Sequence, residues 1–487
     1  MKYISKGRLL IFLLLFSIIT TGLSVFTAYG AKKDEAAPTA PINLKAALIK
    51  SKEVSLSWSK STDNVGVTAY HIYKDGRYIG KTSVNSYVST GLDAAKNYSY
   101  FVKAVDASGN FSKKSQTISV TTLGSQPANP VEPEISNKKR MVGYYAAWSA
   151  YSGFNPDKLD ASKLTHINYA FANIGSDLKI TLGYPDIDPA NIKKLNSLKQ
   201  TYPKLKTLIS VGGWSWSGRF SDAALTDASR TAFADSAIDF IIKYGFDGID
   251  IDWEYPVSGG LETNSRRSED KKNFTLLIKK LREKLDERSS ADGKQYLLTI
   301  AGAAGSWYVN NTELELIHPY LDYANVMTYD IHGTWDKYTD FNAPLYKNND
   351  ITNQYKWSVG EAVNAWLKTG FPSQKLVVGV PFYGYRYTAV NNVNNGLYQT
   401  YSGGSSVSYA NIKANYLNAP GYTRYFHKQS MVPWLFNGST LISYEDEQSI
   451  GLKAQYIKDK NLGGSAIWEL SQDPDKTLLS SLYNGLK

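Results

Sequence analysis

The sequence predicts a (β/α)8 barrel of the α/β class, preceded by a small all-β sandwich. After residue 138, eight short apolar runs recur, and longer amphipathic stretches separate them, as in a parallel sheet built from strand–helix units. Before residue 123, apolar and polar residues alternate in short segments divided by turn residues. At 487 residues the chain is also too long for one ordinary domain.

The first 30 residues resemble a secretory signal peptide. Lys2, Lys6 and Arg8 form a basic start, residues 9–19 are apolar, and residues 28–30 resemble a small-x-small cleavage site. An anchor that is not cleaved is the alternative, because weaker apolar character continues beyond the core. No later segment is long and apolar enough to span a membrane. We therefore expect a secreted, extracellular protein without stable membrane association.

Composition excludes several classes of function. The net charge is +10, but Lys and Arg form no clustered stripe of the kind that binds nucleic acid. The chain has no cysteine, which excludes zinc and iron–sulfur sites built on thiolates and leaves stability to large hydrophobic cores. No cofactor and no metal ion are expected, and the chain is expected to be a monomer.

Residues 37–123 have the pattern of a two-sheet sandwich, followed by a linker at residues 124–137. Several stretches resemble a bacterial fibronectin type III module, namely residues 57–59, 70–73, 91–92 and 106–110. The resemblance implies that Trp58 is the core tryptophan and that Tyr98 or Tyr100 lies near the start of strand F. It also implies a spacer or accessory role, with carbohydrate binding left open.

The barrel is expected to occupy residues 138–487. Its eight predicted strands are residues 141–147, 166–172, 206–211, 246–253, 297–303, 323–329, 376–382 and 464–470. Residues 385–440 are too long and too rich in Asn, Gly, Ser and Tyr for an ordinary connection, so we expect an inserted subdomain that deepens a groove. A doubly wound open sheet is the alternative, but no glycine-rich phosphate loop follows the first strand.

One segment, residues 247–256, carries a row of acids. Asp250, Asp252 and Glu254 alternate with apolar residues, so in a strand the three carboxyls share one face, with Cα atoms about 6.6 Å apart. Like charges this close raise at least one carboxyl pKa, which keeps a carboxylic acid protonated for general-acid work. An exposed edge strand with a solvated acidic face is the alternative.

Aromatic side chains gather around this row at the predicted carboxyl ends of the strands, where barrels carry their sites. The residues at this rim are Tyr144, Tyr145, Trp148, Tyr169, Phe171, Trp214, Met327, Tyr329, Asp330, Tyr383, Arg386 and Trp468. A carboxylate cluster ringed by Trp and Tyr, without a nucleophile–base pair beside it, suggests glycoside hydrolysis.

Five ordered motifs resemble those of bacterial-type chitinases of glycoside hydrolase family 18. They are residues 247–254, which match DxxDxDxE, and residues 208–213, 327–333, 342–345 and 463–468. The similarity runs from about residue 140 to the C-terminus. The insertion before the eighth strand also resembles the α+β insertion domain of this subgroup.

The resemblance implies substrate-assisted hydrolysis with retention. Glu254 would protonate the glycosidic oxygen while the N-acetyl carbonyl of the −1 sugar attacks its own C1 to give an oxazolinium ion. Asp252 would orient the acetamido N–H, and Asp250 would lie behind it. Tyr329 would donate a hydrogen bond to the acetamido oxygen, with Asp330 beside it. The residues expected to bind substrate are Tyr144, Phe171, Trp214, Tyr255, Met327, Tyr383, Arg386 and Trp468, the last of them as the floor of the −1 subsite.

Other residues have competing interpretations. Asp247 lies on the opposite face from the other acids and is expected to serve a turn. Ser210 lacks a histidine partner, so packing or hydrogen bonding is expected rather than nucleophilic catalysis. His332 fits a structural or a site role equally. Trp148, Trp214 and Trp307 are either sugar subsites or core. Tyr383 and Arg386 either line the groove or have a plain surface role.

The leading function is a secreted chitinase that cleaves β-1,4 links between N-acetylglucosamine units. An endo-β-N-acetylglucosaminidase is a second enzyme interpretation, which the inserted subdomain disfavours because a deep groove suits a linear polymer. A non-hydrolytic chitin-binding lectin typically lacks the acid, and here Glu254 is present. A Mg²⁺ or Ca²⁺ enzyme built on the acidic strand is a fourth interpretation, but no phosphate cradle accompanies it.

Overall fold

The computed structural model describes residues 34–49, 52–122, 139–350 and 354–487. The predicted signal peptide and linker lie outside the described residues. The chain divides into two compact units, Met1–Glu132 and Pro133–Lys487. Within the described ranges, no helix has the length and apolar character needed to cross a membrane.

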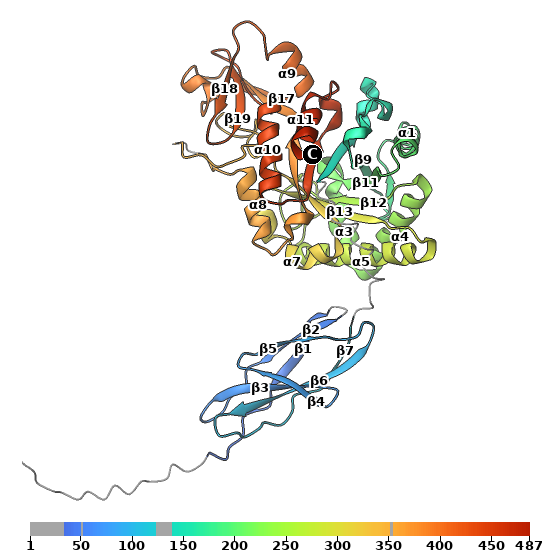
Figure 1. Cartoon of the computed structure of the whole chain (residues 1–487), viewed down its shortest axis with the longest axis vertical. Helices are drawn as coiled ribbons and strands as arrows, with labels where there is room; N and C mark the ends of the chain where they lie inside the picture. The colour runs from blue at the N-terminus through green and yellow to red at the C-terminus, as the bar shows by residue number, and fades with distance from the viewer. Residues whose placement is uncertain (1–33, 50–51, 123–138, 351–353) are drawn as a thin grey trace, which may run out of the picture. The chain divides into compact units, whose positions relative to one another are not determined.

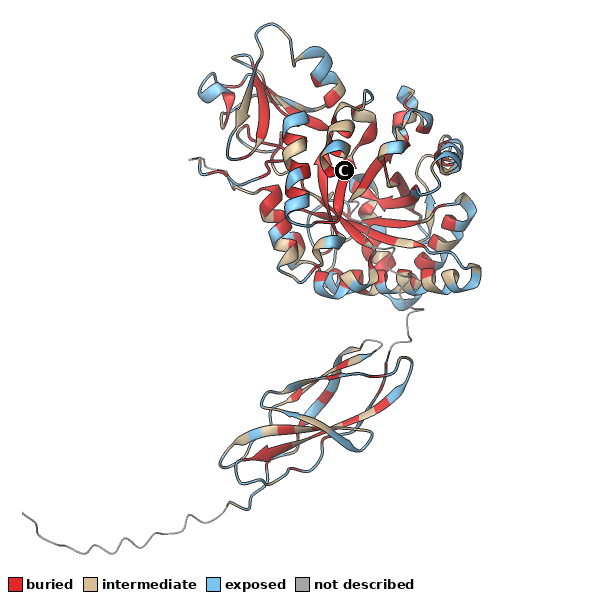
Figure 2. Ribbon diagram, in the orientation of Figure 1, coloured by how far each residue is buried: buried red, intermediate tan, exposed pale blue. Residues whose placement is uncertain are grey.

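The N-terminal unit contains two antiparallel sheets that share one hydrophobic core. The first sheet has the order β1 (Ile42–Ile49), β2 (Glu53–Ser59), β5 (Ser86–Thr90). The second has the order β4 (Arg77–Thr82), β3 (Val67–Lys74), β6 (Asn97–Asp106), β7 (Ile118–Thr121). Figure 2 shows buried residues alternating with more exposed ones along β6, as expected for a sheet with one face on a core. The all-β prediction is confirmed.

Two aromatic residues organise the core of this unit. Trp58 is buried and packs edge-on against Tyr70, with ring centroids 5.3 Å apart. The Tyr98 hydroxyl accepts a hydrogen bond of 2.8 Å from the backbone N–H of Asp93, five residues upstream. This contact is of the kind made by the tyrosine corner of sandwich domains. The fibronectin type III assignment itself stays a prediction.

The C-terminal unit is built on a closed barrel of eight parallel strands, which confirms the predicted fold class (Figure 1). In barrel order the strands are β8 (Arg140–Ala146), β9 (His166–Ile174), β11 (Lys206–Gly212), β12 (Gly248–Asp252), β13 (Leu297–Ala303), β14 (Tyr323–Met327), β15 (Leu376–Pro381) and β21 (Gly464–Trp468). β21 pairs with β8, and β8 pairs with β9, which closes the sheet. A short strand, β10 (Ile180–Leu182), pairs antiparallel with β9.

Helices follow most barrel strands. The longer ones are α1 (Asp188–Thr201), α4 (Asp227–Tyr244), α5 (Asp270–Asp292), α8 (Val359–Leu367), α10 (Glu447–Asp459) and α11 (Thr477–Leu486). Local sequence sets the ends of α4. The Thr226 side chain accepts from the backbone N–H of Ser229, and Gly245 ends the helix with a φ of 74°, a left-handed conformation that glycine adopts readily.

An antiparallel subdomain interrupts the barrel between β15 and α10. Its strands, in sheet order, are β17 (Gly403–Ser408), β16 (Tyr383–Thr388), β20 (Leu441–Ser443), β19 (Val432–Phe436) and β18 (Thr423–His427), and α9 (Tyr409–Asn415) follows β17. The sheet therefore starts two residues before the predicted limit of 385 and ends three residues after 440.

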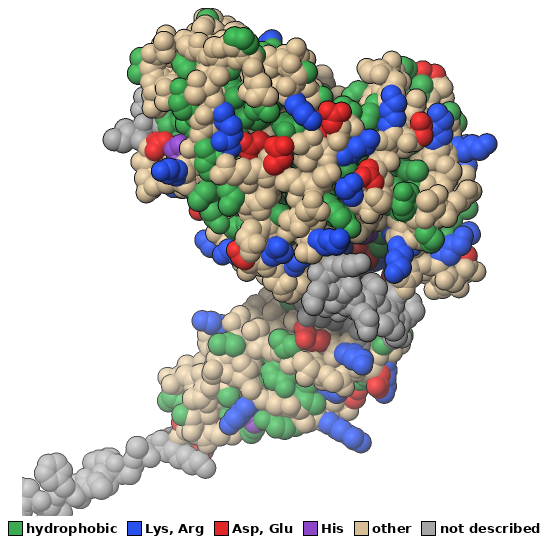
Figure 3. Space-filling model, turned by 45° about the horizontal axis from the view of Figure 1, so that its top comes forward, with side chains coloured by type: hydrophobic (Ala, Val, Ile, Leu, Met, Phe, Trp, Pro, Cys, Tyr) green, Lys and Arg blue, Asp and Glu red, His purple; other side chains and the backbone are tan. Residues whose placement is uncertain are grey.

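Charged side chains are dispersed on the face of the C-terminal unit that Figure 3 draws. Figure 3 shows Lys and Arg side chains of the C-terminal unit spread among Asp and Glu, without a continuous basic stripe on the face in view. The face in view therefore lacks the clustered basic surface that is typical of nucleic-acid-binding proteins.

Candidate active site

A groove of about 1180 Å³ lies at the carboxyl ends of the barrel strands. Three carboxyls line it, those of Asp252, Glu254 and Asp330. The aromatic side chains that line it are Tyr144, Trp148, Phe171, Tyr184, Trp214, Trp216, Tyr255, Trp307, Tyr329, Trp335, Tyr355, Trp357 and Trp468. Flat apolar rings with a few convergent polar groups suit a sugar ligand.

The acids are delivered by β12, a strand in the interior of the sheet between β11 and β13. The strand ends at Asp252, so Glu254 stands just beyond it. Ile251 and Trp253, which alternate with these acids, are almost fully buried. Alternation along the segment is confirmed, and the exposed edge strand is wrong because β12 has a neighbour on each side.

Asp250 lies deepest and is saturated with hydrogen-bond donors. Its Oδ2 accepts from the Tyr144 hydroxyl at 2.9 Å and from Ser210 Oγ at 2.8 Å. Its Oδ1 accepts from Thr299 Oγ1 at 2.5 Å. Burial raises the pKa of Asp250, while these donors act in the opposite direction. The predicted hydrogen-bonding role of Ser210 is confirmed.

Asp252, unlike Asp250, is not saturated with hydrogen-bond donors. Its side chain is buried, yet its Oδ1 is shielded from solvent without a hydrogen-bond partner among the described residues. Burial raises the pKa of Asp252 well above its usual range, and the neighbouring charges of Glu254 and Asp250 raise it further. An unpartnered acceptor beside the groove costs free energy unless a ligand donates to it.

Glu254 is fixed through its backbone. Its N–H donates to Ser217 Oγ at 2.8 Å, and its carbonyl accepts from Asn264 Nδ2 at 3.0 Å. Gly260, at a φ of 71°, approaches so closely that a Cβ there would lie 2.1 Å from the Glu254 carbonyl oxygen. Burial raises the pKa of the Glu254 carboxyl to about 7, with Asp330 as a further cause. The side chain can therefore carry a proton near neutral pH.

The cause of these shifts differs from the expected one. The sequence predicted a raised pKa from repulsion between like charges, whereas burial is the first cause for Asp250, Asp252 and Glu254 alike. Repulsion contributes mainly at Asp252. The strand therefore acts by bringing the carboxyls into a dry environment as well as next to one another.

Tyr329 and Asp330 follow β14 at the groove. Asp330 has a φ of 54°, and its N–H donates to Asn342 Oδ1 at 2.8 Å. Its Oδ1 accepts from the hydroxyls of Tyr383 at 2.5 Å and Tyr385 at 2.7 Å. Burial raises the pKa of Tyr329 well above its usual range, so its hydroxyl stays a donor across the working pH range.

Trp468, at the end of β21, lies among aromatic neighbours. Its ring centroid is 5.6 Å from those of Tyr144 and Phe171 and 6.2 Å from that of Trp148. All four line the groove. These contacts hold the Trp468 ring in one position, which suits it to stack against a sugar.

The structure brings most of the predicted binding residues to the groove, including Trp214, Tyr255 and Met327. It does not bring Arg386 or Tyr383 there, and the Tyr383 hydroxyl instead donates to Asp330 Oδ1 at 2.5 Å. The Arg386 guanidinium donates to the Tyr416 hydroxyl at 2.9 Å and to Ser405 Oγ at 3.3 Å. Side chains alternate along β16, and the tyrosines on either side of Arg386 take the opposite face.

The tryptophans with competing interpretations line the groove. Trp148 and Trp307 are each partly exposed there, as is Trp214, which favours subsites over core. The groove residues that sequence reasoning missed include Tyr184, Trp216, Asn325, Trp335, Tyr355 and Trp357. Trp216 stands two residues from Trp214 and could have been found from that spacing. The residues between 331 and 357 belong to a long connection without periodic pattern.

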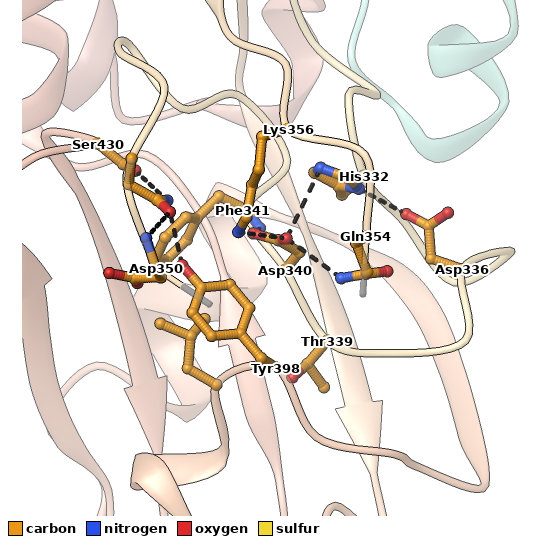
Figure 4. Close-up of polar contacts among 12 residues, drawn as sticks. His332, Asp336, Thr339, Asp340, Phe341, Asp350, Gln354, Lys356, Tyr398 and Ser430 are labelled. Carbon is orange, nitrogen blue, oxygen red and sulfur yellow. Dashed lines mark hydrogen bonds and ion pairs between the residues drawn. The ribbon is translucent and has the colours of Figure 1, made fainter. Parts of the chain in front are cut away.

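His332 belongs to a polar network beside the groove (Figure 4). Its Nδ1 lies 2.9 Å from Asp336 Oδ2, and its Nε2 lies 3.7 Å from Asp340 Oδ2. Asp340 also contacts Lys356 Nζ at 3.3 Å and accepts from Gln354 Nε2 at 3.1 Å. Because Lys356 stands between the groove residues Tyr355 and Trp357, this network connects the loop after β14 to the groove wall.

Asp247 lies at the other end of β12. Its Oδ2 accepts from the backbone N–H of Thr207 at 2.9 Å and pairs with Lys199 Nζ at 2.8 Å. These contacts tie the start of β12 to β11 and α1. The predicted structural role of Asp247 is confirmed.

Comparison with known proteins decides the family. The sequence model described as "Glycosyl hydrolases family 18" matches residues 140–473. The chain belongs to glycoside hydrolase family 18. It is 45% identical over 415 residues to "Chitinase A1" of Niallia circulans, covering 72% of this chain and 59% of that protein. It is 35% identical over 442 residues to "Chitinase ChiA" of Flavobacterium johnsoniae, covering 71% of this chain and 27% of that protein.

Two solved structures have a similar fold. A family 18 N-acetylglucosaminidase from Paenibacillus barengoltzii is 38% identical with a TM-score of 0.66, over 71% of this chain and 99% of that one. Chitinase ChiA74 from Bacillus thuringiensis is 36% identical with a TM-score of 0.68, over 72% of this chain and 70% of that one.

Proposed function

We propose that this family 18 enzyme is a chitinase that hydrolyses β-1,4 links between N-acetylglucosamine units with net retention. One observation carries the proposal. In an aromatic-lined groove, the proton-bearing Glu254 neighbours Asp252, whose buried Oδ1 has no hydrogen-bond partner among the described residues. A sugar bearing an N-acetyl group needs both, because its amide N–H requires an acceptor and its leaving oxygen requires an acid.

The chemistry runs through the substrate's own acetamide. Glu254 gives its proton to the glycosidic oxygen as the C1–O bond breaks. The acetamido carbonyl oxygen attacks C1, and Asp252 Oδ1 accepts the acetamido N–H and stabilises the positive charge of the oxazolinium ion. The Tyr329 hydroxyl donates to the carbonyl oxygen and keeps it aimed. Water, deprotonated by the Glu254 carboxylate, then opens the ring at C1 from the original leaving side, so the configuration is retained.

The deep acid has a supporting role. Asp250 is held by donors from Tyr144, Ser210 and Thr299 and cannot turn toward the substrate without losing them. Its charge raises the pKa of Asp252. When Asp252 turns to the acetamide, the charge of Asp250 favours a proton shared between the carboxyls of Asp250 and Asp252.

Groove composition supports a polymeric substrate. Aromatic rings come from the loops after β8 and β11 on one part of the rim and from those after β13 and β14 on another. Such rings provide stacking positions for several sugars in a row. An N-acetylglucosaminidase is the second candidate, favoured by the similarity to the Paenibacillus barengoltzii enzyme.

We further propose that the protein is secreted and acts as a monomer on chitin or its oligosaccharides, with the N-terminal unit as a fibronectin type III-like accessory module. The basic and apolar start of the sequence supports secretion. Because the chain spans only 59% and 27% of the two relatives named above, their further regions carry no inference for it.

Product analysis tests the function. The full chain is incubated with a chitin hexamer, with a single-sugar N-acetylglucosamine glycoside and with a high-mannose glycoprotein, and early products are followed by proton NMR. We expect β-anomers of short oligomers from the hexamer. Release of monosaccharide alone would favour the N-acetylglucosaminidase, cleavage of the glycoprotein alone would contradict the chitinase, and α-anomers would contradict substrate assistance.

A further inference from the structure

A second group of three acids lies in the N-terminal unit. Asp34, Asp63 and Asp106 each offer a carboxylate oxygen, and these oxygens lie within 4.8 Å of one another. In the described part of the chain, no other group of three or more Asp, Glu or His residues converges this closely. Asp106 is only 3% exposed.

Two of these oxygens are buried without a partner. Asp34 Oδ2 and Asp63 Oδ1 are shielded from solvent, and neither has a hydrogen-bond partner among the described residues. A buried carboxylate oxygen in this state costs free energy, and it does so more strongly when two other carboxylates face it. Buried charges in native proteins are normally paired or coordinate a metal.

The second oxygen of each residue is tied down. Asp34 Oδ1 accepts from Asn64 Nδ2 at 3.0 Å and from the N–H of Ala36 at 3.1 Å. Asp63 Oδ2 accepts from the backbone N–H groups of Val65 and Gly66, both at 3.0 Å. These bonds fix the carboxylates so that their free oxygens face the cluster.

Asn110 holds the third acid in place. Its backbone N–H and its Nδ2 each donate to Asp106 at 2.8 Å. The same Nδ2 donates to the carbonyl oxygens of Asp34 at 2.9 Å and Ala36 at 3.0 Å. In the described residues, none of the three aspartates has an ion pair with Lys, Arg or His. The cluster therefore gathers three negative charges with rigid geometry and no cationic side chain.

The donor set selects the class of cation. All the converging ligands are carboxylate oxygens, which suit hard ions and not zinc or copper. Ca²⁺ binds oxygens at about 2.3–2.6 Å, so ligands on opposite sides of one ion are separated by up to about 5 Å. Mg²⁺ needs about 2.0–2.1 Å in near-ideal octahedral geometry, a tighter arrangement.

We propose that Asp34, Asp63 and Asp106 form a Ca²⁺ site of the N-terminal unit. The three ligands come from the segment before β1, the connection from β2 to β3, and the end of β6. One ion would therefore fasten the start of the sandwich to two of its loops. In a chain without cysteine, this link would stabilise the folded sandwich as disulfides stabilise small extracellular domains.

Calorimetry tests the site. The full chain is stripped with EDTA, dialysed into chelator-free buffer and titrated with CaCl₂ to about 10 mM, above the ~10⁻⁴–10⁻³ M affinities typical of extracellular Ca²⁺ modules. We expect one saturable site per chain and weaker binding of Mg²⁺. Absence of saturable binding would overturn the proposal, and an equal or stronger response to Mg²⁺ would overturn the assignment to Ca²⁺.

Variants locate the ion. Asp63→Asn and Asp106→Asn keep the shape of the side chain and remove its charge, and each should lower the Ca²⁺ affinity at least tenfold. The control is Asp93→Asn, because Asp93 lies in the same unit but is exposed and pairs with Lys96. It should bind Ca²⁺ like the parent chain. Unchanged Ca²⁺ affinity in folded Asp63→Asn and Asp106→Asn, as judged by circular dichroism, would contradict the site.

Stability gives an independent readout. Because the ion binds only the folded unit, saturating Ca²⁺ should raise the unfolding temperature of the N-terminal unit by about 5 °C. The shift should vanish in Asp63→Asn and persist in Asp93→Asn. A Ca²⁺ shift that survives in Asp63→Asn would place the ion elsewhere.

Discussion

The chain contains two triplets of acids, and the repulsion between neighbouring carboxylates is reduced in a different way in each. Asp250 and Asp252 on β12 and Glu254 just beyond it lie in a buried row, and burial raises the pKa of each. In the N-terminal unit, Asp34, Asp63 and Asp106 converge on one point. There the donors of Asn110 outweigh burial and lower the pKa of Asp106, which keeps it ionised.

The difference lies in what surrounds the carboxyls. The carboxyls of the β12 row face aromatic rings and hydroxyl donors. In this environment the carboxyls reduce their negative charge by binding protons. The N-terminal cluster presents fixed carboxylate oxygens toward one another, which is the arrangement that a cation neutralises. Proton transfer therefore belongs to the first triplet and ion binding to the second.

The strongest test of the proton-bearing row is Glu254→Gln. Loss of a general acid should lower kcat on chitin oligomers by about 10²–10⁴-fold, while oligomers still bind because the groove is unchanged. Activity and calorimetric binding are measured side by side. Glu262→Gln, an exposed position in the loop after β12, is the matched control and should keep full activity. Full activity in Glu254→Gln would contradict the role of Glu254.

Asp252→Asn should have the next largest effect, on the order of 10² in kcat, because the amide no longer stabilises the oxazolinium charge. KM should change little, since the neutral side chain can still accept the acetamido N–H. Steady-state kinetics on a chitin tetramer separate the two parameters. A rise in KM with unchanged kcat would mean that Asp252 only binds substrate.

The pH dependence should follow Glu254. Its acid form is lost as the pH rises through a pKa of about 7, so kcat/KM should fall above that pH. The charge of Asp330 contributes to raising this pKa, so Asp330→Asn should move the alkaline limb to lower pH. Tyr385→Phe removes one donor to Asp330 but keeps the charge, and its limb should stay in place. An alkaline limb that stays at the same pH in Asp330→Asn would contradict the electrostatic coupling between Asp330 and Glu254.

The smallest effect is expected behind the groove wall. Asp340→Asn weakens the contacts to Lys356 and Gln354 and should loosen Tyr355, raising KM about threefold to tenfold through lost stacking with little change in kcat. Asp336→Asn, which perturbs the contacts to His332 and to the Gly333 N–H but not those to Lys356 and Gln354, should have a smaller effect. An unchanged KM in folded Asp340→Asn would show that the network does not support substrate binding.

Sequence reasoning succeeded where a pattern is local. Alternation in residues 247–256 was enough to place Glu254 and Asp252 on one face, and all eight apolar runs became barrel strands. The prediction that Arg386 lies at the groove failed because strand β16 begins at Tyr383. Alternation from that start places the Arg386 side chain on the face opposite the tyrosines. The alternation rule could have shown this once the start of the strand was known.

Other features depend on contacts between distant segments. The N-terminal cluster draws on residues 34, 63 and 106, which have no metal-ligand spacing in the sequence. The groove wall at Tyr355 and Trp357 depends on the buried partner Asp340 and on no periodic pattern. Burial as the main cause of the pKa shifts also arises only from the packed barrel.

The contrast between the two triplets is tested most directly by the activity of the chelated enzyme. The full chain is treated with EDTA, and kcat on a chitin tetramer is measured at 25 °C across a series of free Ca²⁺ concentrations. Because β12 works through protons, kcat should be constant throughout the titration. A kcat that falls on chelation and recovers in proportion to Ca²⁺ would contradict the division between a proton-bearing row and an ion-binding cluster.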